Sequence, residues 1–196
     1  GGFANISFRS ENKRIAFDIC PVNFVLNLLA ASLGEVYDAS GNIAASGQTD
    51  HNLLQTLNAL EYYRTPHPKS LGREWVEKHV LSALEGSSLS LPDKMRTFVE
   101  HIAIQVGNII NPVSLPGMKL LVTGGGAHNE YLIQQIAHHT HVEIVVPDKL
   151  TIDYKEALIF AFLGLLRSLG KVNCLSSVTG ASRDSCGGVV HSVITV

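Results

Sequence analysis

Three consecutive glycines, residues 124–126, lie between an apolar segment and the start of an amphipathic one. Glycine has no Cβ, so a ligand can approach the backbone closely at such a turn. A helix that begins directly after it presents unpaired N–H groups and a partial positive charge. The pattern is typical of a nucleotide-binding turn, and a tight strand-to-helix turn without a ligand remains the alternative.

Two acidic residues lie where chemistry is often placed. Asp18 comes near the end of the apolar segment Ile15-Ala16-Phe17 and precedes a proline. A carboxylate at the end of a strand can act as a general base or hold Mg²⁺, and the alternative is an aspartate that caps the turn. Glu156 lies near the start of an apolar helix, where an acidic residue already complements the helix dipole, so the pattern alone favours a structural role.

The remaining chemical candidates are weak. Gly1 and Gly2 favour a flexible end over a phosphate loop. Three histidines at positions 138, 139 and 141 indicate a solvated helix end rather than a zinc site. The three cysteines match neither a zinc site nor a disulfide framework, which favours a reducing compartment. We therefore expect no metal site formed by protein ligands alone.

These residues need elements to position them. Alternation and turn residues predict a hairpin over residues 5–8 and 14–19, then strands over 119–123 and 142–146. Helical periodicity predicts helices over 23–33, 50–60, 73–84, from Ser90 onward, 129–138 and 153–169. The long helix after Ser90 carries one apolar stripe, Met95, Phe98, Val99, Ile102, Val106 and Ile109. Residues 37–47 are predicted to be mostly loop. The order of strands and helices indicates a single α/β domain with a helical insertion.

Composition excludes several classes of partner. The chain has 196 residues and a formal net charge of −2, which favours neither nucleic acid nor an anionic membrane surface. No apolar run approaches the ~20 residues that span a bilayer. The most apolar stretch, residues 157–166, is predicted to be a buried core helix. Without a signal-peptide pattern, we expect a cytoplasmic protein.

Several strings together resemble the anhydro-N-acetylmuramic acid kinase family, in the family's order and over nearly the whole chain. They are residues 1–6, 16–18, 37–38 with Gly41 and Gly47, 68–70 with 72–74, 122–129, 155–158 and 178–181. The resemblance implies an α/β, actin-like ATPase (ribonuclease H-like) lobe, with a mixed sheet flanked by helices. It also implies a cytoplasmic enzyme that uses ATP and Mg²⁺ to cleave 1,6-anhydro-N-acetylmuramic acid with water and phosphorylate O6 in cell-wall recycling.

The resemblance also implies roles for single residues. Asp18 matches the catalytic aspartate that activates the attacking water. Glu156 matches an acidic residue near the sugar, and Asn23 belongs to the same substrate-binding stretch as Asp18. Two sets of residues match the family's nucleotide-binding loops. Gly1 and Gly2 match a phosphate loop, and the adenosine loop is matched by Gly124, Gly125, Gly126 and Asn129. Lys69, Ser70 and Arg73 match a family signature without a firm role.

Two departures from the family pattern bear on function. The family has Asp-Thr-Gly-Pro-Gly-Asn where this chain has Asp-Ile-Cys-Pro-Val-Asn, residues 18–23. Cys20 and Val22 therefore add side chains where the backbone should approach a ligand. The family's N-terminal lobe, with its first phosphate loop, is not in the sequence. Residues 1–196 are accordingly interpreted as the C-terminal lobe, which needs the N-terminal lobe as partner and is inactive alone.

Other functions stay open at this point. The runner-up is a non-catalytic sugar- or nucleotide-binding module with the same fold. An acyl-phosphate-forming or N-acetylglucosamine-type kinase of the same superfamily would share the glycine turn, but it fits residues 68–74 less well. The expected partners are an amino sugar, the N-terminal lobe and a second copy of the chain.

Overall fold

The chain begins with an antiparallel hairpin. The computed structural model describes residues 2–191. Strand β1 (Phe3–Ser10) pairs with β2 (Lys13–Pro21), and the turn between them places Glu11 and Asn12 at positive φ. The register shifts between Ala4 and Asn5, so that Asn5 pairs with Asp18. The hairpin predicted from alternation is confirmed, with longer strands than the sequence suggested.

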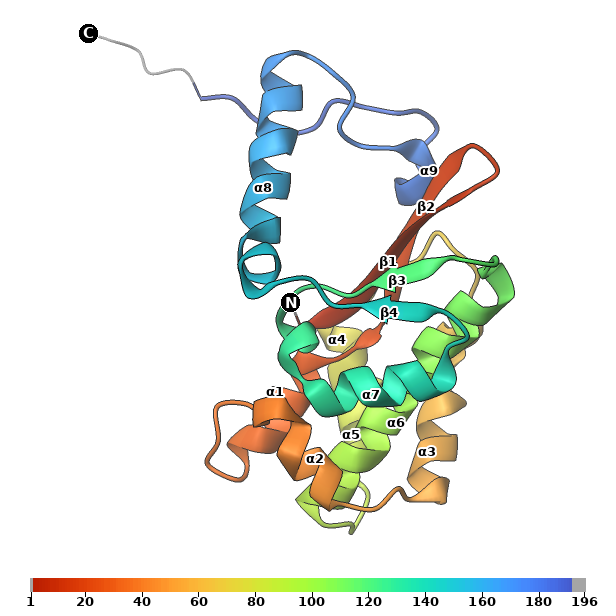
Figure 1. Cartoon of the computed structure of the whole chain (residues 1–196), viewed down its shortest axis with the longest axis vertical. Helices are drawn as coiled ribbons and strands as arrows, with labels where there is room; N and C mark the ends of the chain where they lie inside the picture. The colour runs from red at the N-terminus through yellow and green to blue at the C-terminus, as the bar shows by residue number, and fades with distance from the viewer. Residues whose placement is uncertain (1, 192–196) are drawn as a thin grey trace, which may run out of the picture.

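A layer of helices follows the hairpin, as Figure 1 shows. Its α-helices are α1 (Asn23–Ala31), α2 (Asn42–Ser46), α3 (His51–Asn58), α4 (Arg73–Trp75), α5 (Ser82–Glu85) and α6 (Leu91–Ile110). A π-helical segment, Val76–Leu81, joins α4 to α5, and 3₁₀ helices cover Ala39–Gly41, Glu61–Arg64 and Asn111–Val113. The long predicted helices are confirmed, whereas the short α2 lies in a region expected to be mostly loop.

Helix α6 forms the centre of the core. Ser90 caps it by accepting a hydrogen bond from the N–H of Asp93 at 3.2 Å, and Pro92 lies in the first turn. Its predicted stripe is buried except for the half-buried Ile109. The same helix buries His101, whose ring nitrogens contact Asn58 Oδ1 at 2.7 Å and the Tyr63 hydroxyl at 3.0 Å. Burial lowers the pKa of His101 to about 3, so this histidine is neutral at physiological pH.

The segment after α6 is a strand–helix–strand unit. Strand β3 (Lys119–Leu121) leads through the glycine turn into α7 (Glu130–His139) and then β4 (Glu143–Val145). The two strands are parallel, and the N–H of Val122 extends their pairing to the carbonyl of Val145 at 2.9 Å. The α/β class is therefore confirmed, with helices packed on short strands.

The sheet itself differs from the expectation of one mixed sheet. Among residues 2–191, β1 pairs with β2 and β3 with β4, which gives two separate two-stranded sheets. Strands β3 and β4 have three residues each, so they offer few backbone groups for a further partner. The expected order of elements is correct, and the expected single sheet is not observed.

Helix α8 (Lys149–Ser168) corrects another prediction. Residues 157–166 were expected in a buried core helix, yet Ile152 is the buried residue of α8. Leu158 is 72% and Phe160 is 70% exposed, and Figure 1 shows α8 standing apart from helices α1–α7. Its apolar sequence reports a preference for burial, but no described part of the chain covers it.

The last described residues return to the hairpin. Helix α9 (Ser176–Thr179) lies against β2, where the Ser177 hydroxyl donates to the carbonyl of Arg14 at 2.7 Å. Gly180, at a φ of +75°, lies beside Pro68, and a Cβ there would approach the proline ring to 3.1 Å. This segment therefore links the family strings at residues 68–74 and 178–181.

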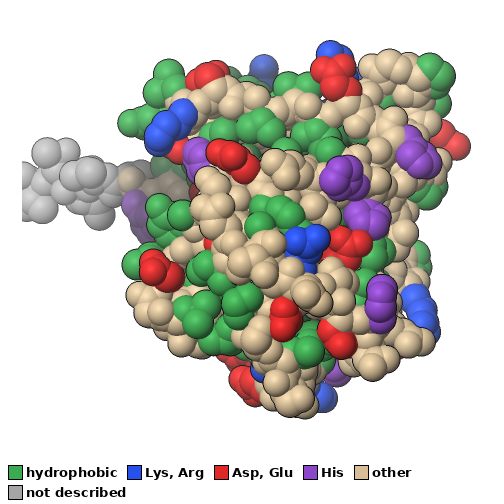
Figure 2. Space-filling view, turned by 60° about the horizontal axis from the view of Figure 1, so that its bottom comes forward, with side chains coloured by type: hydrophobic (Ala, Val, Ile, Leu, Met, Phe, Trp, Pro, Cys, Tyr) green, Lys and Arg blue, Asp and Glu red, His purple; other side chains and the backbone are tan. Residues whose placement is uncertain are grey.

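The surface has mixed character. On the face in Figure 2, acidic and basic side chains are interspersed and neither sign forms a continuous patch. None of the helices described is both long enough and apolar enough to cross a membrane.

Candidate functional site

Asp18 is fixed near the end of β2 by two hydrogen bonds from distant residues. The backbone N–H of Leu71 donates to Asp18 Oδ2 at 2.8 Å, and the Tyr62 hydroxyl donates to the Asp18 carbonyl at 2.6 Å. Within the described residues, Oδ1 has no hydrogen-bond partner. The carboxylate is therefore oriented by one oxygen and keeps the other for a ligand or a proton.

The loop before α4 is packed onto the strand that carries Asp18. The ring of His67 stacks on Phe17 with 5.5 Å between centroids. The Lys69 ammonium donates to the Tyr62 carbonyl at 3.0 Å and lies 4.4 Å from the centroid of the Tyr62 ring. Burial lowers the pKa of Lys69. The loop with the family signature that begins at Pro68 thus holds Asp18 in place. No local sequence pattern indicated this role of the loop.

The structure buries the two residues that depart from the family pattern, Cys20 and Val22. The Cys20 side chain is fully buried and Val22 is 5% exposed, so both belong to the core. Burial raises the pKa of the Cys20 thiol, which keeps the thiol protonated. Both side chains therefore pack inward, and Val22 Cγ1 lies 3.8 Å from the position that a Cβ on Gly126 would take. The expectation that they limit the approach of a ligand stays a prediction.

Gly2 has a structural role in the described chain. Its carbonyl accepts hydrogen bonds from the N–H groups of Val22 at 2.8 Å and Phe24 at 3.1 Å. A Cβ at Gly2 would approach Phe24 Cβ to 3.0 Å. Gly1 lies outside the described residues, so a phosphate-binding role of this pair stays a prediction.

The glycine turn has the conformation that its sequence predicts. Gly124 has a φ of 82°, which favours glycine, and the next four residues form the 3₁₀ helix η5 (Gly125–His128). Asn129 is buried and caps α7 by accepting a hydrogen bond from the N–H of Leu132 at 2.9 Å. A Cβ on Gly125 would lie 3.0 Å from Asn23 Nδ2. The turn and the start of α1 therefore face each other closely.

A cavity of about 550 Å³ lies at this junction. Three predicted site residues line it: Asn23, Gly125 and Asn129. Its other lining residues are Leu26, Asn27, Tyr37, Asp38, Ala39, Ser40, His128 and Lys149. The structure thus brings together the predicted substrate-binding asparagine and part of the glycine turn. Asp18 does not line the cavity, but it precedes Asn23 by five residues, at most about 17 Å of extended chain.

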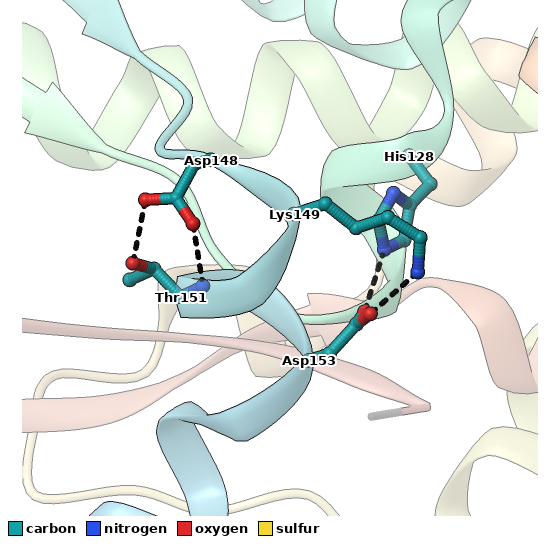
Figure 3. Close-up of polar contacts among 5 residues, drawn as sticks. All are labelled: His128, Asp148, Lys149, Thr151 and Asp153. Atoms are coloured by element: carbon teal, nitrogen blue, oxygen red, sulfur yellow. Dashed lines mark hydrogen bonds and ion pairs between the residues drawn. The ribbon is translucent and has the colours of Figure 1, made fainter.

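Helix α8 begins with Lys149, which lines this cavity, and Figure 3 shows the first turn of the helix beside His128. Asp148 caps it by accepting hydrogen bonds from the Thr151 N–H at 3.0 Å and the Thr151 hydroxyl at 2.8 Å, which lower the Asp148 pKa. Asp153 pairs with Lys149 and lies 3.3 Å from His128 Nε2. The Lys149 hydrogen bond is the main cause that lowers the Asp153 pKa. This carboxylate joins two cavity-lining side chains from different elements.

Glu156 lies apart from these groups. It is exposed on α8, one turn beyond Asp153, and does not line the cavity. A role for Glu156 toward a sugar stays a prediction. Within the described residues, no group of three His, Cys, Asp or Glu side chains could hold a metal ion.

Sequence reasoning missed most of the cavity wall, including its three most chemically distinctive side chains, Tyr37, His128 and Lys149. Tyr37 and His128 lie inside strings that carry the family resemblance, but the resemblance assigns neither residue a role. Lys149 precedes the predicted start of its helix, and nothing in its surroundings in the sequence indicates that it approaches the glycine turn.

Comparison with known proteins points to one family. The family model described as anhydro-N-acetylmuramic acid kinase matches residues 1–192. A relative of that name from Saccharophagus degradans is 34% identical, with 98% of this chain and 54% of the relative covered. Relatives of the same name from Aliivibrio fischeri and Coxiella burnetii are each 32% identical, with 97% of this chain and 54% of the relative covered. The chain spans about half the length of the curated relatives it matches.

Proposed function

Because the chain belongs to the anhydro-N-acetylmuramic acid kinase family, we propose that it forms the nucleotide-binding lobe of a kinase acting on 1,6-anhydro-N-acetylmuramic acid. The observation that carries the proposal is the placement of Asn23. This residue lies directly beside the glycine turn in the cavity wall and follows the anchored Asp18 by five residues. One short segment therefore connects a candidate nucleotide site to a candidate base.

The cavity suits an adenine nucleotide. Its wall includes a glycine, the amide of Asn23 and the start of α7, all of which suit a close approach by a polar ligand. Lys149 and His128 add basic groups that favour phosphate. Since no cluster in residues 2–191 could hold a metal by itself, Mg²⁺ would enter bound mainly to the phosphates of ATP. When bound, Mg²⁺ supplies charge neutralisation during phosphoryl transfer.

In the proposed reaction, Asp18 Oδ1 takes a proton from the attacking water. The water oxygen bonds to the anomeric carbon as the bond from that carbon to O6 breaks. O6 then bonds to the γ-phosphorus of ATP as the bond from that phosphorus to the ADP oxygen breaks, and ADP leaves. The Leu71 N–H keeps the Asp18 carboxylate in one orientation, with Oδ1 left to accept the proton. Glu156 and Asn23 are proposed to contact the sugar.

The proposed enzyme needs a second lobe. Leu158, Phe160 and Phe162 on α8 are each more than half exposed, and the relatives are about twice as long as this chain. A helix that is apolar on all sides is ordinarily buried in a larger protein. We assign the surface that packs on α8 to the other half of the kinase, and a second copy of this chain is the alternative. We also propose that the enzyme has an actin-like fold and lies in the cytoplasm.

The test combines this chain with the part of the Saccharophagus degradans relative that it does not span. ATP, Mg²⁺ and the anhydro sugar are added, and the product is followed by mass spectrometry. We expect the 6-phosphate of N-acetylmuramic acid from the mixture and none from either part alone, since transfer needs groups on both sides of the γ-phosphate.

A Leu158→Asp variant tests the surface on which the two parts would meet. It should weaken their association about tenfold or more while the chain stays folded, because Leu158 is exposed. Product from this chain alone would contradict the need for a second lobe. Nucleotide binding without product in the mixture would instead favour a binding module.

A further inference from the structure

Tyr37 is an exposed aromatic residue at the edge of the cavity, and the proposed mechanism gives it no role. Its side chain is 60% exposed, although it lines the same cavity as the glycine turn. The next residue, Asp38, is buried and accepts hydrogen bonds from the N–H groups of Ile43 at 2.8 Å and Ala44 at 3.0 Å. The backbone that carries Tyr37 is therefore anchored, while its ring keeps most of its surface in solvent.

An anchored, exposed ring beside a polar cavity suits a planar ligand. Aromatic side chains stack on nucleic-acid bases, because every base has a flat π face. Tyr37 is the aromatic residue in the cavity wall, whose other members are mainly asparagines, small residues and charged side chains. The wall thus has one surface for a flat ring and several groups for polar atoms.

The charges in the wall indicate what a ring-bearing ligand would carry. Both carboxylate oxygens of Asp38 already accept backbone hydrogen bonds. Lys149 and His128 are the basic groups, and both contact Asp153, which does not line the cavity (Figure 3). The cavity therefore offers an aromatic face and a cationic side chain, which together match a base joined to phosphate.

We propose that Tyr37 stacks on the base of the bound nucleotide and that Lys149 contacts its phosphates, with Asp153 as the residue that positions Lys149. This inference rests on the proposed nucleotide-binding function and adds the residues that would give the site its specificity. It assigns a role to a family string, residues 37–38, that the proposed reaction leaves unused.

The test for Tyr37 uses NMR titration of the chain with ADP and with adenosine. Tyr37→Ala should weaken both ligands about tenfold, within the range of base–aromatic stacking. Tyr37→Phe keeps the ring and should bind as the parent does. Tyr154→Ala is the matched control, because Tyr154 is 63% exposed on α8 and does not line the cavity.

The test for Lys149 compares the same two ligands. Lys149→Met should lower the affinity for ADP about threefold or more and leave the affinity for adenosine unchanged, because adenosine has no phosphate. The matched control is Lys119→Met, which also removes an exposed ion pair, the one between Lys119 and Glu143 at 2.8 Å. Asp153→Asn should lower the affinity for ADP as well, as Lys149→Met does.

The possible outcomes distinguish the roles of Tyr37 and Lys149 from the proposed nucleotide-binding function. Unchanged binding in Tyr37→Ala, or equal loss in Tyr37→Phe, would overturn the stacking role. Equal loss of ADP and adenosine in Lys149→Met, or an equal effect of Lys119→Met, would overturn the phosphate contact. A parent chain that binds neither ligand would contradict the proposed nucleotide site itself, and this inference with it.

Discussion

The backbone N–H of Leu71 donates a hydrogen bond to Asp18 Oδ2 at 2.8 Å across 53 residues of sequence. The Tyr62 hydroxyl holds the carbonyl of the same aspartate, and Lys69 in turn holds the Tyr62 carbonyl. The strand and the loop therefore form one unit around the candidate base. A change in the loop should alter the chemistry at Asp18 even though its hydrogen bond to the carboxylate comes from the loop backbone and not from a side chain.

The glycine turn gives a direct test of the nucleotide site. Gly125→Val should abolish or strongly reduce ATP binding, because even a Cβ would approach Asn23 Nδ2 to 3.0 Å. Gly164→Val is the control, since Gly164 lies on α8, does not line the cavity, and has no atom within 4 Å of its Cβ position. Calorimetry measures the binding and circular dichroism the fold. If Gly125→Val binds ATP as well as Gly164→Val does, the turn is not part of the site.

Gly41 should be intolerant of any side chain. A Cβ at Gly41 would collide with Asn129 Oδ1 and Tyr131 Cβ, and the φ of +78° disfavours other residues. Gly41→Ala should therefore lower the free energy of unfolding by about 2–4 kcal/mol. Gly117→Ala isolates the backbone cost, because Gly117 has a φ of +79° with no atom near its Cβ position. It should cost only about 1 kcal/mol in urea denaturation, and equal losses would show that the close packing at Gly41 is unimportant.

The buried His101 should make the chain sensitive to acid. Its pKa is about 3 in the folded chain, below the ordinary value of about 6.5 expected after unfolding. The contribution of neutral His101 to the free energy of unfolding is therefore complete above about pH 6.5 and is lost as the pH falls toward 3. About 2 kcal/mol of that free energy should be lost between pH 6.5 and 5. Urea denaturation at both values, with His101→Gln for comparison, measures this loss. An equally steep loss in His101→Gln would assign the acid sensitivity to other groups.

The parts of the fold that the sequence predicted are those set by local patterns. Helix α6 followed from the Ser90 cap and an apolar stripe, and α7 followed from the glycine turn and Asn129. The five-residue helix α2 was missed because its start depends on the buried carboxylate of Asp38, which accepts two of its N–H groups. So short a helix carries too few residues to show periodicity.

The parts that it could not predict depend on distant contacts. Nothing near Asp18 indicates that Leu71 will approach it, and nothing near Lys149 indicates the glycine turn. Burial of α8 was inferred from its composition, which gives a preference for an apolar environment without naming what provides it. The resemblance named Asn23 and the glycine turn as site residues. Their shared cavity required the structure.

Asp18 is the residue on which the proposed chemistry depends. The decisive measurement uses a preparation containing this chain that phosphorylates the anhydro sugar, and compares the rate of product formation with the affinity for ATP in Asp18→Asn. We predict that the rate falls about 10² to 10⁴-fold while ATP affinity stays within about twofold, because the variant keeps an acceptor for the Leu71 N–H but cannot take the proton from water. Turnover close to that of the parent, or loss of ATP binding in parallel with the rate, would contradict the assignment of Asp18 as the base.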